Sequence, residues 1–457
     1  MAVSDLNKAR AVKEWREEER TIALHNKRLL MTEVENYGRV DTPLLILTLL
    51  LICYGLIMLF SVSMSAAYAE YNDPLYYFMR QFRFSVFGFI LMFIVARFIP
   101  VRRFNQVPIL LGVYGFVTML LLAVFVMGKE GDFGGMRWLE LGPIQFQPSE
   151  VAKLGIIFCL SSYYALIRKM QRKGKWVVKD EKQQLMIDGR LYILLPAGAT
   201  GAWMLLIGMQ PHLSGLIITF LLTLALMIAA GIPWRVWLNG LIQFLPILLV
   251  LVLLLVLLFP SMKGQSFIEF LEEKFAHVKT RLEIYSNPEG VDDDTIFQVR
   301  QARYALGSGG WTGKGIGMGQ QKAGFLPMVY NDYILPAIGE ELGFLGTASV
   351  LILFLAYFYL GLRVALNASS IFNAMITFGS TFLITIQAFL NVAVASEVIP
   401  STGVSLPFFS YGGTANLFFM LAASLVLNVS RSGQRADPEL EKIFRKRRSR
   451  MRAGRKQ

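Results

Sequence analysis

Three acidic residues stand where a long polar segment gives way to an apolar one. Asp332 ends the polar segment 260–332, and Glu340 and Glu341 follow inside the apolar stretch 333–361. A carboxyl group in such a place can have a raised pKa, accept a proton or bind a divalent cation. An ordinary aspartate at a membrane interface would occupy the same place, so position alone leaves the role of Asp332 open.

A second pair of charged residues, Glu150 and Lys153, opens another apolar stretch. Ser149 can cap a helix that starts after Pro148, and Glu150 in the first turn suits the helix dipole. Residues three apart share a helix face and can pair. A charge inside a membrane helix costs at least about 2.5–3.5 kcal/mol at the centre and less near an end. The pair is therefore either a boundary ion pair that fixes helix packing or part of a functional site.

A glycine-rich segment, GSGGWTGKGIG (307–317), invites comparison with phosphate-binding loops. A Walker A motif requires glycine at position 308 and Ser or Thr directly after Lys314, but Ser308 and Gly315 stand there. We therefore exclude nucleotide binding. Two interpretations remain: a flexible turn, or a tight loop whose backbone amides face a pyrophosphate. His212 stands alone between two predicted spans, and we expect an isolated histidine of this kind to be an ordinary loop residue rather than a catalyst.

The elements that must position these residues are membrane-spanning helices. Hydrophobic residues make up 54% of the 457 positions and charged residues only 17%, against about 45–50% and about 25% in soluble domains. Several apolar runs exceed the roughly 20 residues needed to cross a bilayer. We predict an all-α protein, and its eighth span is long enough for the first part to be bent or only partly inserted. The ten predicted spans are 43–62, 84–99, 106–127, 149–168, 191–209, 213–230, 236–259, 333–361, 371–395 and 404–429.

The distribution of charge predicts the topology. With the N-terminus inside, the predicted inner loops are basic, whereas the outer loops are balanced or nearly uncharged, as the positive-inside rule requires. The net charge of +13 is therefore explained by topology and by anionic lipid headgroups rather than by nucleic acid. The basic residues of the inner side are Arg97, Arg102, Arg103, the stretch 168–190, Arg235, Arg363 and those from Arg431 onward.

The chain is predicted to have three parts. A charged cytoplasmic tail (1–42) precedes the transmembrane domain (43–430), and a basic cytoplasmic tail (431–457) follows it. The first apolar run starts too late for a typical secretory signal and is expected to remain as an anchor. Outside the membrane lie a short segment, 128–148, and the long loop 260–332, whose first part has the spacing of an amphipathic surface helix.

Four stretches together resemble the SEDS family, the shape, elongation, division and sporulation proteins typified by FtsW, RodA and SpoVE. The last stretch matches the family's C-terminal signature from Asn391 to Ala415. All four come in the family's order, and the resemblance covers about 43–430. The stretches are FQPSEVAKL (146–154), GSGGWTGKGIG with FLP (325–327), NDYILPAIGEELGFLG (331–346) and VIPSTGVSLPFFSYGGT (398–414).

The resemblance implies a bacterial plasma-membrane enzyme with ten spans that polymerises lipid II into glycan strands. The family's essential acidic residue lies in a stretch that usually reads like HTDFIF, and YNDYIL here makes Asp332 its counterpart. Tyr330 and Asn331 replace the usual His and Thr. Met328 stands where an acidic residue is usual, and so does His212 in the loop between the fifth and sixth spans.

The implied reaction needs a base near the acceptor hydroxyl and positive charge or a metal at the departing pyrophosphate. Asp332 is the candidate for the base, or for a ligand of Mg²⁺ or Mn²⁺; no organic cofactor is expected. The candidates for pyrophosphate are Lys314, Lys322, Arg300 and Arg303, and the candidates for other substrate contacts are Glu150, Lys153, Ser410, Gly412 and Gly413.

Two other functions stay open from the sequence: a transporter that flips lipid II, with intramembrane charges along its path, and a scaffold without activity. The resemblance also implies partners, namely a class B penicillin-binding protein and other membrane proteins of the division or elongation machinery. A role in division, elongation or sporulation is not decided, although the long charged N-terminal tail favours division.

Overall fold

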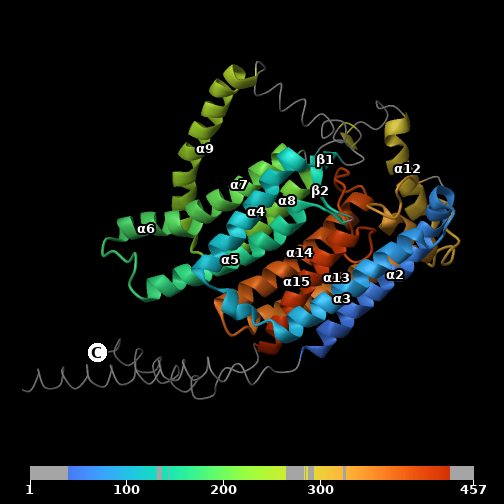
Figure 1. Ribbon diagram of the computed structural model, residues 1–457, viewed down its shortest axis with the longest axis horizontal. Helices are drawn as coiled ribbons and strands as arrows, with labels where there is room; N and C mark the ends of the chain where they lie inside the picture. Colours follow the sequence, from blue (N-terminus) through green and yellow to red (C-terminus); the bar gives the residue numbers. More distant parts are fainter. Residues whose placement is uncertain are drawn as a thin grey trace, which may run out of the picture.

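A bundle of long helices dominates the computed structural model (Figure 1). It describes residues 40–130, 136–142, 144–210, 212–263, 283, 285–286, 293–322 and 326–432. A 3-10 turn at Val101–Phe104 and a π-helical turn at Arg190–Leu194 connect some of the helices. The helices are α2 (Thr42–Tyr71), α3 (Tyr76–Phe98), α4 (Val107–Met127), α5 (Pro148–Arg172), α6 (Glu181–Gly189), α7 (Leu195–Met209), α8 (Leu213–Ala229), α9 (Trp234–Lys263), α12 (Asp293–Ser308), α13 (Ile334–Leu366), α14 (Ile371–Ala395) and α15 (Gly413–Ser432).

A helix coincides with each of the ten predicted spans. By length and composition, eight helices of the described part could cross a membrane, with the run from α6 through α7 counted as one, and α8 is a shorter apolar helix. The helical fold of a polytopic membrane protein is thus confirmed, while the count of ten spans and the orientation of the termini stay predictions. Most of both predicted tails and of the amphipathic segment lies outside the described residues.

The described part departs from the all-α expectation in the outer segment 128–148. There β1 (Lys129–Glu130), β2 (Met136–Leu141) and β3 (Ile144–Phe146) form an antiparallel sheet in that order. Gly142 has a φ of +63°, a left-handed conformation that suits the turn between β2 and β3. The sheet forms the connection between α4 and α5, and β2 packs against both helices.

The last predicted span differs at its start. We expected it to begin at 404, but α15 begins at Gly413, and 400–412 has no regular structure beyond turns. Leu406 and Phe409 in this stretch are fully buried although they are not helical. Side chains of α14 and α15 bond this backbone in place of a helical ladder.

The helices that carry the candidate residues pack together at the centre of the bundle. In particular α14 contacts α5, α8, α13 and α15, and α3 packs along α15. By contrast α9 packs against α6 and the π-helical turn and then extends away from the bundle (Figure 1). Side chains along α9, among them Leu245 and Leu249, are more than 60% exposed, which suits contact with lipid.

Candidate active site

Helix α13 is broken at Gly343, as its length suggested. Gly343 has φ 67° and ψ −163°, so the helical hydrogen bonds from Phe344 and Leu345 back to Glu340 and Glu341 cannot form. The glycine-rich segment replaces them. Its carbonyl groups accept from α13 and its amides donate to α13, in the bonds Phe344 N to Gly310 O (2.8 Å), Leu345 N to Trp311 O (3.1 Å), Lys314 N to Glu340 O (3.0 Å) and Gly315 N to Glu341 O (2.9 Å).

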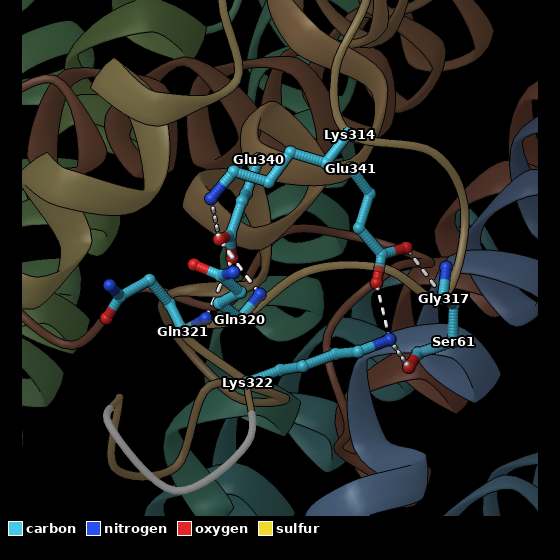
Figure 2. A network of polar contacts seen from close by, with 8 residues as sticks. All are labelled: Ser61, Lys314, Gly317, Gln320, Gln321, Lys322, Glu340 and Glu341. Carbon is cyan, nitrogen blue, oxygen red and sulfur yellow. Dashed lines mark hydrogen bonds and ion pairs between the residues drawn. The ribbon is translucent and has the colours of Figure 1, made fainter.

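The Glu340 carboxylate, which is fully buried, is the anion that this loop binds (Figure 2). Lys314 Nζ lies 2.7 Å from Oε1 of Glu340. The backbone amide of Gln320 donates to the same oxygen at 2.9 Å, and that of Gln321 donates to Oε2 at 3.0 Å. A lysine and successive amides around an anion are the parts of a phosphate loop, but here they enclose a carboxylate of the protein itself.

The Glu341 carboxylate, also fully buried, pairs with Lys322 at 2.6 Å. Ser61 of α2 connects the two partners, because its hydroxyl donates to Glu341 at 2.6 Å and its carbonyl accepts from Lys322 at 2.8 Å. The Gly317 amide donates to the Ser61 hydroxyl at 3.0 Å. The network therefore ties the segment 314–322 to both α2 and α13 (Figure 2).

This geometry bears on two expectations from the sequence. The glycine-rich segment is not an isolated flexible turn, and the amides of Lys314, Gly315 and Gly317 already donate within the protein. Lys314 and Lys322 neutralise α13 carboxylates, so either lysine could meet a pyrophosphate only by leaving its partner. Their assignment to substrate stays a prediction, and the structure adds a structural role for both.

Asp332 lies on the turn that leads into α13 and is partly exposed. The backbone of this turn is held from two directions. Asn391 of α14 donates its amide hydrogens to the carbonyl groups of Asp332 (2.9 Å) and Val404 (2.7 Å), and Tyr411 N donates to the carbonyl of Tyr330 at 2.8 Å. Asn391 was part of the signature recognised in the sequence, but its contact with Asp332 was not foreseen.

Helix α12 carries Arg300 and Arg303 and is bonded to the turn that precedes Asp332. Both are exposed and lie three residues apart, on one helix face. The forked guanidinium of Arg303 binds both carboxylate oxygens of Glu397, which raises the pKa of Arg303 through its hydrogen bond and charge. Gln298 of the same helix donates to the carbonyl of Pro327 at 3.1 Å. These contacts attach α12 to the turn before Asp332 and to the turn after α14.

Glu150 and Lys153 form a buried pair, with Lys153 Nζ 2.6 Å from Glu150 Oε1. Lys153 also donates to Gln387 of α14 at 3.1 Å. Nearby His212 occupies the position directly before α8 and is buried, and its side chain makes no capping hydrogen bond to that helix. Desolvation, together with the positive charges of Lys153 and Arg137, lowers the pKa of His212 to about 3, so this imidazole is neutral at ordinary pH. The contacts that the structure shows for the Glu150–Lys153 pair are with protein groups.

Ser410, Gly412 and Gly413 shape the turn before α15. The Ser410 hydroxyl accepts from Leu406 N at 2.7 Å, and Gly412 N donates to Gln81 of α3 at 3.2 Å. A Cβ on Gly413 would lie 2.3 Å from the Phe84 ring. The turn thus lets α15 approach α3 closely, and contact of these three residues with substrate stays a prediction.

A divalent cation at Asp332 was one expectation from the sequence. Within the described part of the chain, no three His, Cys, Asp or Glu residues gather closely enough to hold a cation. Asp332 therefore has no protein-built cage around it there. A cation at Asp332 would need ligands from elsewhere, such as phosphate oxygens and water, as Mg²⁺ commonly has.

Comparison with known proteins identifies the family. Residues 42–435 match the cell cycle protein family that comprises FtsW, RodA and SpoVE. The chain belongs to the FtsW/RodA/SpoVE family. The match takes in α2 through α15, and so all the candidate residues discussed above.

Members of this family resemble the chain over nearly its whole length. A probable peptidoglycan glycosyltransferase FtsW of Geobacter metallireducens is 32% identical over 408 residues, which cover 89% of this chain and 97% of the relative. Stage V sporulation protein E of Bacillus subtilis is 29% identical over 392 residues, which cover 86% and 97%. The chain is thus similar to members with different cellular roles.

Solved structures of the family share the fold. The crystal structure of the rod shape determining protein RodA of Thermus thermophilus matches with a TM-score of 0.56 and 23% identity, over 87% of this chain and 98% of that one. A chain from a peptidoglycan synthase complex that coordinates polymerization and crosslinking matches with a TM-score of 0.60 and 24% identity, over 86% and 98%. With eight membrane-length helices among the residues that the structure describes, this FtsW/RodA/SpoVE protein is a multi-pass protein of the plasma membrane.

Proposed function

We propose that this protein is a peptidoglycan glycosyltransferase that polymerises lipid II on the outer face of the plasma membrane. The observation that carries the proposal is the setting of Asp332. Asp332 is partly exposed, it lies on the turn that leads into α13, and the backbone of this turn is held by Asn391 and Tyr411. It also stands where the related family has its essential acidic residue.

The proposed chemistry is a displacement at the anomeric carbon of one lipid-linked disaccharide. The 4-hydroxyl oxygen of a second disaccharide forms the new bond, and the bond to undecaprenyl pyrophosphate breaks. Asp332 accepts the proton that this hydroxyl loses, and a carboxylate on a fixed backbone can be held within hydrogen-bond reach of it. A lipid substrate requires a site at the membrane surface, which the start of α13 supplies.

We propose that α12 supplies the main positive charge for the departing pyrophosphate. Arg300 and Arg303 are exposed on one face of this helix, and Glu397, the partner of Arg303, is itself partly exposed, whereas Lys314 and Lys322 pair with fully buried carboxylates of α13. Guanidinium groups are well matched to phosphate oxygens. A divalent cation at Asp332 would be bound together with the phosphates of the substrate and would add positive charge there. No step described above depends on this cation.

The proposal extends to a partner. One structural relative comes from a peptidoglycan synthase complex in which polymerization and crosslinking are coordinated. We propose that this protein likewise works with a cross-linking penicillin-binding protein. Transport of lipid II is the weaker candidate, because the FtsW relatives are named probable peptidoglycan glycosyltransferases and the buried Glu150–Lys153 pair is satisfied by protein groups.

Purified protein in liposomes with lipid II tests the function. The wild type should form glycan polymer, and Asp332→Asn should reduce the rate at least about a hundredfold, as expected when a general base is lost. Asp73→Asn, the same change on an exposed residue of the turn between α2 and α3, is the matched control and should keep wild-type activity. Movement of lipid II across the bilayer without polymer would refute the enzyme and support the transporter.

A further inference from the structure

A chain of hydroxyl groups links the turn that carries Asp332 to an exposed carboxylate on α2. The hydroxyl oxygens of Tyr330 and Tyr77 lie 2.8 Å apart, and the Tyr77 hydroxyl donates to Oε2 of Glu70 at 2.5 Å. Tyr77 and Tyr330 are both buried, whereas Glu70, in the last turn of α2, is exposed. The chain therefore runs from the interior beside the candidate active site to the molecular surface.

The direction of these hydrogen bonds follows from the donors available. A tyrosine hydroxyl has one hydrogen, and a carboxylate oxygen only accepts. Tyr77 donates its one hydroxyl hydrogen to Glu70, so Tyr330 is the donor in the contact between the two tyrosines. Glu70 thus orders both hydroxyls, and each bond in the chain has one defined orientation.

The rings reinforce this geometry. Those of Tyr330 and Tyr77 stack with centroids 4.2 Å apart, and that of Tyr411 meets Tyr77 edge-on at 4.9 Å. The Tyr411 amide also donates to the Tyr330 carbonyl. Tyr330 is therefore held at its ring, its hydroxyl and its backbone.

Two residues further on, the Asp332 carbonyl is held by Asn391. The backbone from 330 to 332 is thus fixed at both ends, and the Asp332 side chain leaves from the second fixed point. A displacement of about 1 Å at a reacting group can lower a rate by about a hundredfold. Small losses of order at Tyr330 should therefore reach the chemistry.

We propose that Glu70 and Tyr77 are positioning residues for Asp332 and act on it through Tyr330, an inference that rests on the proposed glycosyltransferase function. The inference explains why a tyrosine at position 330, in place of the usual histidine, is compatible with an ordered site. Aromatic residues are common at membrane interfaces for their amphipathic rings alone. That general role needs the rings, whereas positioning needs the hydroxyls and the carboxylate.

Variants that keep the rings separate these roles. Tyr330→Phe and Glu70→Ala should each lower kcat for lipid II polymerisation about three- to tenfold, the worth of one ordered hydrogen bond. The KM and the thermal unfolding midpoint should stay near those of the wild type. Glu70→Gln should retain activity, because its amide oxygen still accepts from Tyr77. Tyr68→Phe removes an exposed hydroxyl near the end of the same helix and should change nothing.

A double variant tests whether the residues act through one chain. Tyr330→Phe combined with Glu70→Ala should cost no more than either change alone, since each already breaks the same path. Wild-type kcat in Tyr330→Phe, or additive losses in the double variant, would overturn the inference while leaving the function intact. A wild-type protein that makes no polymer would overturn the proposed function, and the inference with it.

Discussion

Lys322 and Glu341 show at the scale of single residues how a charge is kept inside this protein. The lysine is 3% exposed and the glutamate not at all, and Ser61 contacts both. A buried ion pair adds little over an apolar pair, but removal of one partner leaves the other charge unpaired. The same argument applies less strongly to Lys314, which is more exposed than Lys322.

Lys322→Met should therefore destabilise the protein by roughly 3–5 kcal/mol, because Glu341 is left as an unpaired buried carboxylate. The measurement is unfolding in detergent. Lys129→Met breaks an exposed pair with Glu140 and should cost about 0–1 kcal/mol, which makes it the matched control. The double variant Lys322→Met with Glu341→Leu should recover part of the loss. Equal effects of the two lysine changes would contradict the structural role.

At the scale of elements, the break in α13 and the glycine-rich segment form one unit. Four backbone hydrogen bonds cross between them, in the place of those that the helix lacks. Such a close backbone approach leaves no room for a side chain. A Cβ on Gly309 would lie 1.9 Å from the carbonyl oxygen of Gly339, and Gly313 has a φ of +79°. Glycine is needed at these positions for packing and conformation, not for flexibility.

Gly309→Ala should for this reason lower stability by about 1–3 kcal/mol, the usual cost of overpacking, and should also lower polymer formation. Gly307→Ala is the control: a Cβ there meets nothing within 4 Å and the residue lies within α12. Alanine is the better helix former, so that variant should be neutral or slightly more stable. Thermal unfolding of the two variants side by side provides the comparison. A Gly309→Ala protein as stable as Gly307→Ala would show that the close approach does not exist.

At the scale of the whole molecule, the helix bundle fixes the relative positions of the segments that connect its helices. Three separate stretches meet near Asp332: the turn that carries it, helix α12, and the residues 397–411. From inside the bundle, α14 contributes contacts through Asn391 and Gln387, and α3 contributes contacts through Tyr77 and Gln81. The candidate site is therefore built by packing between helices distant in the chain.

The orientation of the bundle makes a separate prediction. In a variant with Cys53 and Cys159 replaced by alanine, a membrane-impermeant maleimide should label Glu283→Cys in intact spheroplasts. Lys175→Cys, which is exposed between α5 and α6, should be labelled only after the membrane is opened. The reason is the excess of basic residues on the inner loops. The reverse pattern would mean that the proposed active site faces the cytoplasm.

Much of the architecture follows from local features of the chain. Apolar runs long enough to span a bilayer determined the helices, and the length of the eighth run indicated its bend. Short motifs in a fixed order determined the family and pointed to Asp332. Both signals are carried by neighbouring residues, so they can be read without knowledge of the fold.

For residues far apart in the sequence, only the tertiary structure decided which groups are partners. Ser61 meets Lys322 and Glu341 across more than 250 positions of sequence, and Tyr77 meets Tyr330 across a similar span. A lysine on an outer loop suits a phosphate as well as a buried carboxylate, and the choice depends on what packing brings within 3 Å. The late start of α15 has the same cause, because side chains of α14 and α15 bond the stretch before it in place of a helical ladder.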